Sequence, residues 1–286
     1  MVNYLHFLLI LYIYNKNKIM KEEWIKLYND GKSFSDISKI VNVPTTTVWR
    51  KIKNDVIIKE KKFYGEKLRQ YRIDENFFEK IDTKNKAYIL GFLLADGHRC
   101  KNVKQIRLKL QEQDKEILEK IKIAMNYDKP LNYEKRKLIT HQNTYSLIIC
   151  NSKICDDLEN FGIVKNKTFD ITIPNISDEL FIDLFRGYFD GDGWISIYDR
   201  KFILPELGII GEYNFILSIK EKIKELYNIE SYIKTDKRHD NRIKSLVIRK
   251  LDDIRKIHQI MYANDSLSLN RKNNKFNEIL KEHDNL

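Results

Sequence analysis

The sequence predicts an α+β protein made of two pseudo-symmetric αββαββα repeats, preceded by a small all-α domain. Two observations predict the repeats. An apolar helical segment ending in Asp-Gly occurs in residues 87–98 and again in 184–196, and each copy is followed by the order strand, strand, helix, strand, strand, helix. A third observation, three short helical patterns in residues 20–56, predicts the all-α domain. Each repeat should form one antiparallel sheet, and two twisted sheets side by side make a saddle.

Composition and pattern divide the 286 residues into five segments. With 42% hydrophobic residues, the chain can bury a sizeable core. We assign 1–19 to an apolar leader, 20–56 to a helix-turn-helix domain, 57–79 to a basic linker, 80–168 to repeat one and 169–286 to repeat two.

The leader and the cysteines indicate an intracellular protein that is not secreted. Residues 2–14 are apolar, but they lack the basic start of a signal peptide and are too short to span a bilayer. Cys100, Cys150 and Cys155 form no CxxC or zinc-binding pattern, so we expect reduced thiols. No export and no membrane partner are expected.

The all-α domain has the pattern of a DNA-binding module. Its third helix is expected over residues 45–52, with Thr45 as a candidate N-cap and Val48 and Ile52 pointing inward. This is similar to the helix-turn-helix of resolvases, whose second motif helix enters the major groove. The alternative is a three-helix packing module without a ligand. The candidate DNA contacts are Thr45, Thr46, Thr47, Arg50 and Lys51.

The charge distribution points to a polyanionic partner. The net charge is +11, and residues 1–72 hold 15 Lys+Arg against 7 Asp+Glu. Charge alone does not distinguish nucleic acid from a membrane surface. Because the surplus of positive charge is concentrated in residues 1–72, this segment would supply much of any salt-sensitive attraction to DNA.

The two apolar helices are expected to pack against each other. Gly91 and Ala95 lie four apart on the first, and Gly187 and Gly191 occupy the same places on the second. Glycine inside a helix costs about 1 kcal/mol relative to alanine, so small residues at this spacing indicate a close approach of two backbones.

Packed in this way, the helices would bring Asp96 and Asp192 to the same end of the pair. Both acids lie near a helix C-terminus, where the macrodipole disfavours an anion, and the two carboxylates repel each other. A divalent cation would relieve both effects, and Mg²⁺ is commonly bound by one or two carboxylates plus substrate phosphates. A single Asp-Gly would more simply be a helix-ending turn, but two matched copies favour a site.

At these residues the sequence resembles the LAGLIDADG homing endonucleases of the single-chain, two-motif kind. ILGFLLADG and FRGYFDGDG match the nine-residue signature, and the second also carries its acidic sixth residue, Asp190, where the first has Leu94. The resemblance implies a monomer that cleaves double-stranded DNA at a specific site with Mg²⁺, or Mn²⁺ as a substitute. It implies that Asp96 and Asp192 are the essential acids, with Ala95 and Gly191 beside them at the metal sites. It also implies a compartment that contains DNA.

The strands supply candidate base contacts. Residues 104–111 alternate, with Ile106 and Leu108 on one face and Arg107 and Lys109 on the other, so one face can cover the helices while the other meets the major groove. Each outward residue is equally well explained as solvated surface. The candidates are Arg107, Lys109, Ser196, Tyr198, Arg200, Lys234 and Lys244.

The resemblance also implies basic and polar groups that reach the active sites. Lys167 and Lys272 follow the closing helices of the two repeats and would stabilise charge that develops on the phosphate. Lys165 and Arg271 are the adjacent alternatives for this role, and each lysine is otherwise explained as ordinary surface. Gln111 is similar to a family residue that positions water, and its counterpart in repeat two is expected to be Gly211.

Other functions fit the sequence less well. A DNA-binding regulator or an intron RNA maturase could use the same scaffold. Loss of Asp96 or Asp192 would favour either of these functions, and both residues are present. A resolvase-like recombinase would need a serine nucleophile domain that the sequence does not show. An intein would need a terminal Cys or Ser and a terminal His-Asn, and the chain ends HDNL.

Overall fold

The computed structural model describes residues 18–56, 71–136, 142–164, 173–199, 201–202, 204–235, 242–263 and 267–285. The chain divides into two compact units, residues 1–70 and 71–286. Several predictions lie outside the described residues: the leader over 1–17, the linker over 57–70, Lys167 and Arg200. Within the described part, no helix is both long enough and apolar enough to cross a membrane.

The first unit contains a helix over residues 18–29, then α2 (Phe34–Val41) and α3 (Thr45–Ile52). Ser33 and Asp36 form a reciprocal capping box at the start of α2. Val48 and Ile52 are fully buried, as predicted. The expectation that Thr45 caps α3 is wrong: the N-cap is Pro44, which offers no side-chain acceptor, and Thr45 is the first helical residue.

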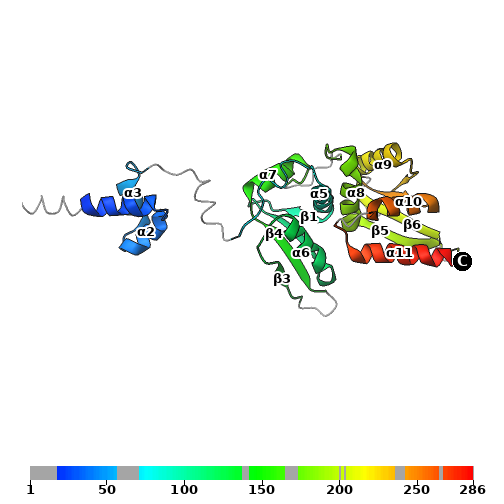
Figure 1. Cartoon of the computed structure of the whole chain (residues 1–286), viewed down its shortest axis with the longest axis horizontal. Helices are drawn as coiled ribbons and strands as arrows, with labels where there is room; N and C mark the ends of the chain where they lie inside the picture. Colours follow the sequence, from blue (N-terminus) through cyan, green and yellow to red (C-terminus); the bar gives the residue numbers. More distant parts are fainter. Residues whose placement is uncertain are drawn as a thin grey trace, which may run out of the picture. The chain divides into compact units, whose positions relative to one another are not determined.

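The second unit contains two repeats of the same element order (Figure 1). Repeat one consists of α5 (Lys84–Asp96), β1 (Gly97–Arg99), β2 (Ile106–Gln111), η1 (Glu112–Asp114), α6 (Lys115–Ala124), β3 (Asn132–Glu134), β4 (Thr144–Ile149) and α7 (Ser152–Asn160). Repeat two consists of α8 (Asp178–Asp192), β5 (Gly193–Asp199), β6 (Leu204–Glu212), α9 (Tyr213–Tyr227), β7 (Tyr232–Thr235), β8 (Ile243–Ile248), α10 (Leu251–Tyr262) and α11 (Asn270–Asp284). The predicted αββαββα order is confirmed, and α11 is an addition to it.

Each repeat forms one four-stranded antiparallel sheet. The strand orders are β1-β2-β4-β3 and β5-β6-β8-β7, which are equivalent. On β2, Ile106 and Leu108 are buried in the core while Arg107 and Lys109 are half-exposed on the opposite face, because strand side chains alternate. The fold class predicted from the sequence, two antiparallel sheets with their helices, is therefore confirmed.

Helices α5 and α8 lie side by side between the two sheets (Figure 1). Each helix belongs to the core of its own repeat, and Leu180 and Leu184 of α8 also enter the core of repeat one. The helix pair is therefore the structural centre of the unit, and it carries the two motifs.

Candidate active site

Helices α5 and α8 approach each other through backbone atoms. A Cβ atom added to Gly91 would lie 2.0 Å from the carbonyl oxygen of Leu184, and one added to Gly187 would lie 2.0 Å from the carbonyl oxygen of Tyr88. The contact is reciprocal, and no side chain larger than hydrogen fits at either place. At the next turn, a Cβ on Gly191 would lie 2.3 Å from the Cβ of Ala95. These four residues are the helix interface that the sequence predicts.

The two acids emerge at the same end of this pair. Asp96 is the last residue of α5 and Asp192 the last of α8. The Oδ2 atom of Asp96 lies 3.3 Å from the position of a Cβ on Gly191, the residue that precedes Asp192. Both carboxylates raise the pKa of the same tyrosine, Tyr188. Asp96 is exposed and Asp192 half-buried, so the end of the pair is accessible to a ligand.

Each helix turns directly into a strand at the glycine that follows its acid. Both glycines have φ in the ordinary negative range, −70° at Gly97 and −97° at Gly193. Their requirement is steric. A Cβ on Gly97 would lie 2.2 Å from the carbonyl oxygen of Leu93, and one on Gly193 would lie 2.5 Å from that of Phe189.

Lys272 lies beneath the end of α8. Its ammonium donates to the carbonyl oxygens of Phe189 at 2.6 Å, Gly191 at 3.1 Å and Gly193 at 2.7 Å. These bonds satisfy carbonyls at a helix C-terminus and place a positive charge where the macrodipole is negative. Burial lowers the pKa of Lys272 to about 8, while the nearby carboxylates, Asp96 and Asp192 among them, act to raise it. The structure thus brings Lys272 to the acids, with its three N–H groups directed at the backbone.

Asp190, the acidic sixth residue of the second motif, is buried behind the site. Its Oδ2 accepts hydrogen bonds from the Tyr88 hydroxyl at 2.8 Å and from the Leu269 backbone N–H at 2.7 Å. Burial raises the pKa of the Asp190 carboxyl to about 6, and these bonds oppose the rise. The equivalent Leu94 is half-buried and packs against the cores of both repeats. The sixth position is therefore structural in both motifs.

The segment from Leu269 to Lys272 also contacts repeat one. The Arg271 guanidinium forms two hydrogen bonds to the buried Asp114 carboxylate, at 3.1 and 2.9 Å, and Asn270 donates to Glu116. This segment thus joins η1 and α6 of repeat one to the end of α8. The sequence gives no local signal for the Arg271–Asp114 pair, because 157 residues separate its members.

The counterpart of Gln111 is Glu212, which corrects the prediction of Gly211. Gly97 pairs with Leu108, and Gly193 pairs with Ile209. Three residues further along β2 and β6 lie Gln111 and Glu212, which are therefore equivalent positions of the two repeats. Gln111 is exposed and accepts a hydrogen bond from Gln113 at 2.8 Å. The Glu212 carboxylate caps α9 by accepting from Asn214 and Phe215 N–H groups. The prediction failed because the two repeats differ in length between the motif and this strand.

Sequence reasoning also missed Tyr188. Tyr188 lies in the last turns of α8, four residues before Asp192, and its hydroxyl donates to the Ile210 carbonyl at 2.9 Å. Burial and the charges of Asp192, Asp96 and Glu212 raise its pKa. Tyr188 therefore links the end of the helix pair to strand β6.

The other predicted contact residues are spread over the two sheets and α3. Lys109 pairs with Glu134 at 2.5 Å, and Lys244 donates to Thr235 at 3.1 Å. Tyr198 is exposed, and Trp49 on α3, which was not predicted, is also exposed. The candidates that the described residues show as exposed or half-exposed are Thr45, Thr46, Thr47, Arg50, Lys51, Arg107, Lys109, Ser196, Tyr198, Lys234 and Lys244.

The donor atoms at the helix-pair end fit a hard cation. Asp96 and Asp192 supply carboxylate oxygens, and the carbonyls of Ala95 and Gly191 lie next to them in the chain. The described residues contain no group of three or more His, Cys, Asp or Glu side chains able to hold a metal. Two carboxylates suit Mg²⁺, which keeps waters and takes further oxygens from substrate phosphates. They do not suit zinc, which is held by three or four protein ligands.

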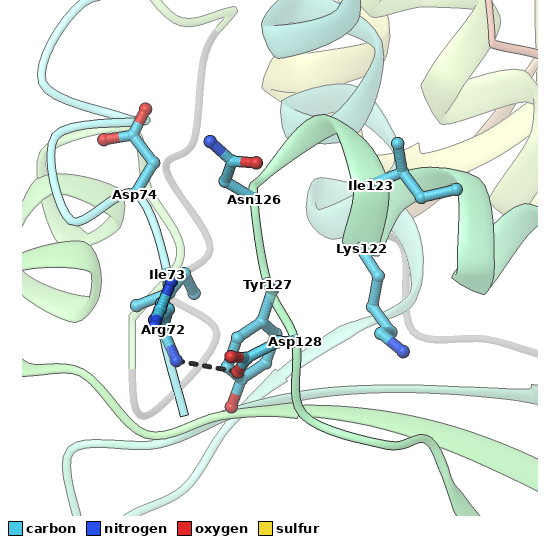
Figure 2. A pocket seen from close by; sticks show the side chains of 8 residues that line it. All are labelled: Arg72, Ile73, Asp74, Lys122, Ile123, Asn126, Tyr127 and Asp128. Atoms are coloured by element: carbon cyan, nitrogen blue, oxygen red, sulfur yellow. Dashed lines mark hydrogen bonds between the residues drawn. The ribbon is translucent and has the colours of Figure 1, made fainter. Parts of the chain in front are cut away.

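A separate pocket lies between the segment that opens the second unit and the end of α6. Figure 2 shows Arg72 and Asp74 on one side and Lys122 and Tyr127 on the other, and the backbone N–H of Arg72 donates to Asp128 at 2.7 Å. None of the predicted site residues lines this pocket. We do not assign it to the active site.

Comparison with known proteins is informative at the level of structure. No protein-family model and no curated protein matches the chain. The homing endonuclease I-WcaI bound to its DNA recognition sequence is similar with a TM-score of 0.50 and 13% identity, covering 70% of this chain and 91% of that one. The I-LtrWI LAGLIDADG homing endonuclease bound to target DNA has a TM-score of 0.48 and 13% identity over 74% and 92% of the two chains. The N-terminal LAGLIDADG domain of DUF199/WhiA has a TM-score of 0.45 and 15% identity over 72% and 93%. The first similarity shows that this chain contains the fold of a homing endonuclease, as its two motifs predict.

Proposed function

We propose that this chain is a Mg²⁺-dependent endonuclease that cuts both strands of a specific DNA site as a single chain. One observation carries the proposal: Asp96 and Asp192 end two helices whose backbones touch, so one duplex can present a phosphate of each strand to one carboxylate each. The shared fold with I-WcaI, which was solved on its DNA recognition sequence, supports it.

Asp96 and Asp192 would hold the Mg²⁺ ions of the two sites, with Mn²⁺ as a substitute and with the carbonyls of Ala95 and Gly191 close by. Bound Mg²⁺ supplies Lewis-acid stabilisation of phosphate charge and lowers the pKa of bound water. The protein orients the acids: the helix contact fixes their separation, and the glycines that follow them direct both chains into the sheets. Because the helix contact fixes both backbones, the acids need little rearrangement when the substrate binds.

Lys272 would act on the charge of the site through its field. Its N–H groups donate to backbone carbonyls, and its positive charge offsets the negative end of the α8 dipole below Asp192. In this role Lys272 need not touch the phosphate. We propose that Lys167 serves repeat one and that Gln111 and Glu212 border the water that attacks. None of these residues is proposed as a metal ligand.

DNA would lie across the sheet faces opposite the helices. Strands place side chains on that face at every second residue, and a sheet of this kind fits the major groove. The first unit would add affinity through α3 and its basic residues, with a steep dependence on salt. We propose a monomer, because the two motifs already provide both half-sites.

A cleavage selection tests the function. The folded full chain is incubated with a library of random duplexes with Mg²⁺, with Mn²⁺ and with EDTA, and cut ends are sequenced. We expect one long preferred site, cut on both strands only with metal. A folded chain that binds DNA but cuts no duplex would contradict the nuclease and support a DNA-binding regulator. Binding of structured RNA in preference to duplex DNA would support a maturase.

A further inference from the structure

Arg249 forms a cluster with three side chains from the other three strands of the second sheet. The guanidinium carbon of Arg249 lies 4.5 Å from the ring centre of Tyr198 on β5 and 5.2 Å from that of Tyr232 on β7. Its Nε donates a hydrogen bond to Oε2 of Glu206 on β6 at 2.7 Å, and its Nη2 forms an ion pair with the same oxygen at 2.6 Å. Arg249 directly follows β8. The cluster therefore crosses the whole width of the sheet.

The register places this cluster on the face that points away from the helices. Leu207 pairs with Ile248, and both belong to the core beneath α9 and α10. Glu206 and Arg249, one residue to either side, therefore point to the opposite face. On that face Glu206 pairs with Ser196, a residue predicted to face DNA.

Glu206 would be unfavourable on a face that meets phosphates unless its charge were neutralised. Its carboxylate is nearly buried, with 7% of the residue exposed, and the hydrogen bond and ion pair with Arg249 neutralise its charge. The side chain of Arg249 is 39% exposed. A guanidinium has five N–H donors in a rigid fork, so binding through Nε and Nη2 leaves the Nη1 edge directed at further acceptors. The carboxylate and the two rings fix the plane of that fork.

We propose that Arg249 is a specificity residue that reads one guanine in the major groove of the half-site bound by repeat two. It rests on the proposed function, since it requires DNA to lie on this face. An arginine fork pairs with the O6 and N7 acceptors of guanine and with no other base in the same way. The fixed plane distinguishes Arg249 from Lys234 and Lys244, whose flexible ammonium groups act as point charges.

The position of the cluster locates that guanine within the site. Tyr198 lies six residues beyond Asp192 along β5, and strands rise by about 3.3 Å per residue, which gives roughly 20 Å. Since base pairs are stacked at about 3.4 Å, the guanine should lie roughly six pairs from the phosphate cut beside Asp192. It belongs to the outer part of the half-site.

The experiment compares the cleavage and binding profiles of the full chain and three variants over all single-base changes of the selected site. Arg249→Ala is expected to lose discrimination at one guanine in the outer part of one half-site by about 5- to 150-fold, with other positions unchanged. Arg249→Lys should restore affinity without restoring that discrimination. Arg255→Ala, which removes an arginine of α10 paired with Asp284, is the matched control and should keep the wild-type profile.

A modified base provides a test that needs no variant. Replacing that guanine with 7-deazaguanine removes the N7 acceptor, and we expect wild-type affinity to fall while Arg249→Ala does not respond. A wild-type protein that cuts its site while Arg249→Ala keeps the same profile would refute the inference and leave the proposed function standing. Equal loss on all sequences with a smaller salt dependence would also refute it, because that result identifies a phosphate contact. If the folded wild type neither binds nor cuts duplex DNA, both proposals fail.

Discussion

The two repeats differ less in their motifs than in what surrounds them. In both, a helix ends in an acid, turns at a glycine and enters a four-stranded sheet, and the glycine contacts between the helices are reciprocal. In repeat two, the sixth residue of the motif is the buried Asp190, which binds the segment leading into α11, and Lys272 from α11 caps the helix. In repeat one that position is Leu94, which packs against both cores.

This difference shows that the two motifs keep the same acids and glycines while the residues that pack behind them differ. The acids and the glycines are constrained by geometry in both halves, because a shift of either helix changes the separation of the two carboxylates. The residues behind them differ: Asp190 and Lys272 are held by hydrogen bonds in repeat two, whereas Leu94 is held by packing in repeat one. We therefore expect equal effects from changes at the helix pair and unequal effects from changes behind it.

The largest expected effect, equal in both halves, comes from the acids. Asp96→Asn and Asp192→Asn should each lower double-strand cleavage by about 100-fold or more, since under the proposed function each removes a charged metal ligand from one strand's site. Each single variant should still nick the opposite strand, which a supercoiled plasmid assay detects as open circles. Binding to uncleaved DNA in Ca²⁺ should persist in both. Loss of nicking on both strands from one substitution would show that the two sites share their metal.

The glycine contacts should respond equally as well. Gly91→Ala and Gly187→Ala each place a Cβ 2.0 Å from a carbonyl oxygen that cannot move without shifting its helix, so we expect each to lower the free energy of unfolding by about 3 kcal/mol. Gly211→Ala is the comparison, because its Cβ would meet a side-chain atom, the Tyr188 hydroxyl at 2.5 Å, and not a helix backbone, so we expect a smaller loss that reflects the Tyr188–Ile210 hydrogen bond. Urea unfolding measures the three changes. A much smaller effect at one of the two interface glycines would show that the repeats are not equivalent there.

These glycines illustrate what the sequence could predict. The spacing of small residues and the alternation of apolar residues are local patterns, so the helix pair and the buried face of β2 follow from the residues themselves. Helix α11 was missed because its charged sequence buries few residues, chiefly Phe276 and Ile279. The cluster around Arg249 depends on strand register, which residue patterns alone did not fix.

The cap on α8 should give repeat two a dependence on pH. Burial lowers the folded pKa of Lys272 to about 8, below the ordinary value of 10.5, so between these values the unfolded chain binds more protons and stability rises with pH. The gain from this group should be about 2–3 kcal/mol across that window. Lys272→Met should remove it, so the difference in unfolding free energy between wild type and variant should change between pH 7.5 and 10. Lys256→Met, at an exposed lysine that bonds the Tyr227 carbonyl, is the control. A constant difference would mean that Lys272 is not desolvated.

The smallest expected effect tests how the segment before α11 joins the repeats. Arg271 and Asp114 form a two-bond pair in which Asp114 is nearly buried, so a double-mutant cycle with alanine at both positions should give a coupling of about 1–2 kcal/mol in unfolding free energy. The exposed Arg255–Asp284 pair, which lies within repeat two, should give less than about 0.5 kcal/mol. Because the first pair spans both repeats, its removal should also lower the cooperativity of unfolding, seen as a smaller dependence on urea. Equal couplings for the two pairs would show that the repeats are held together by the helix pair alone.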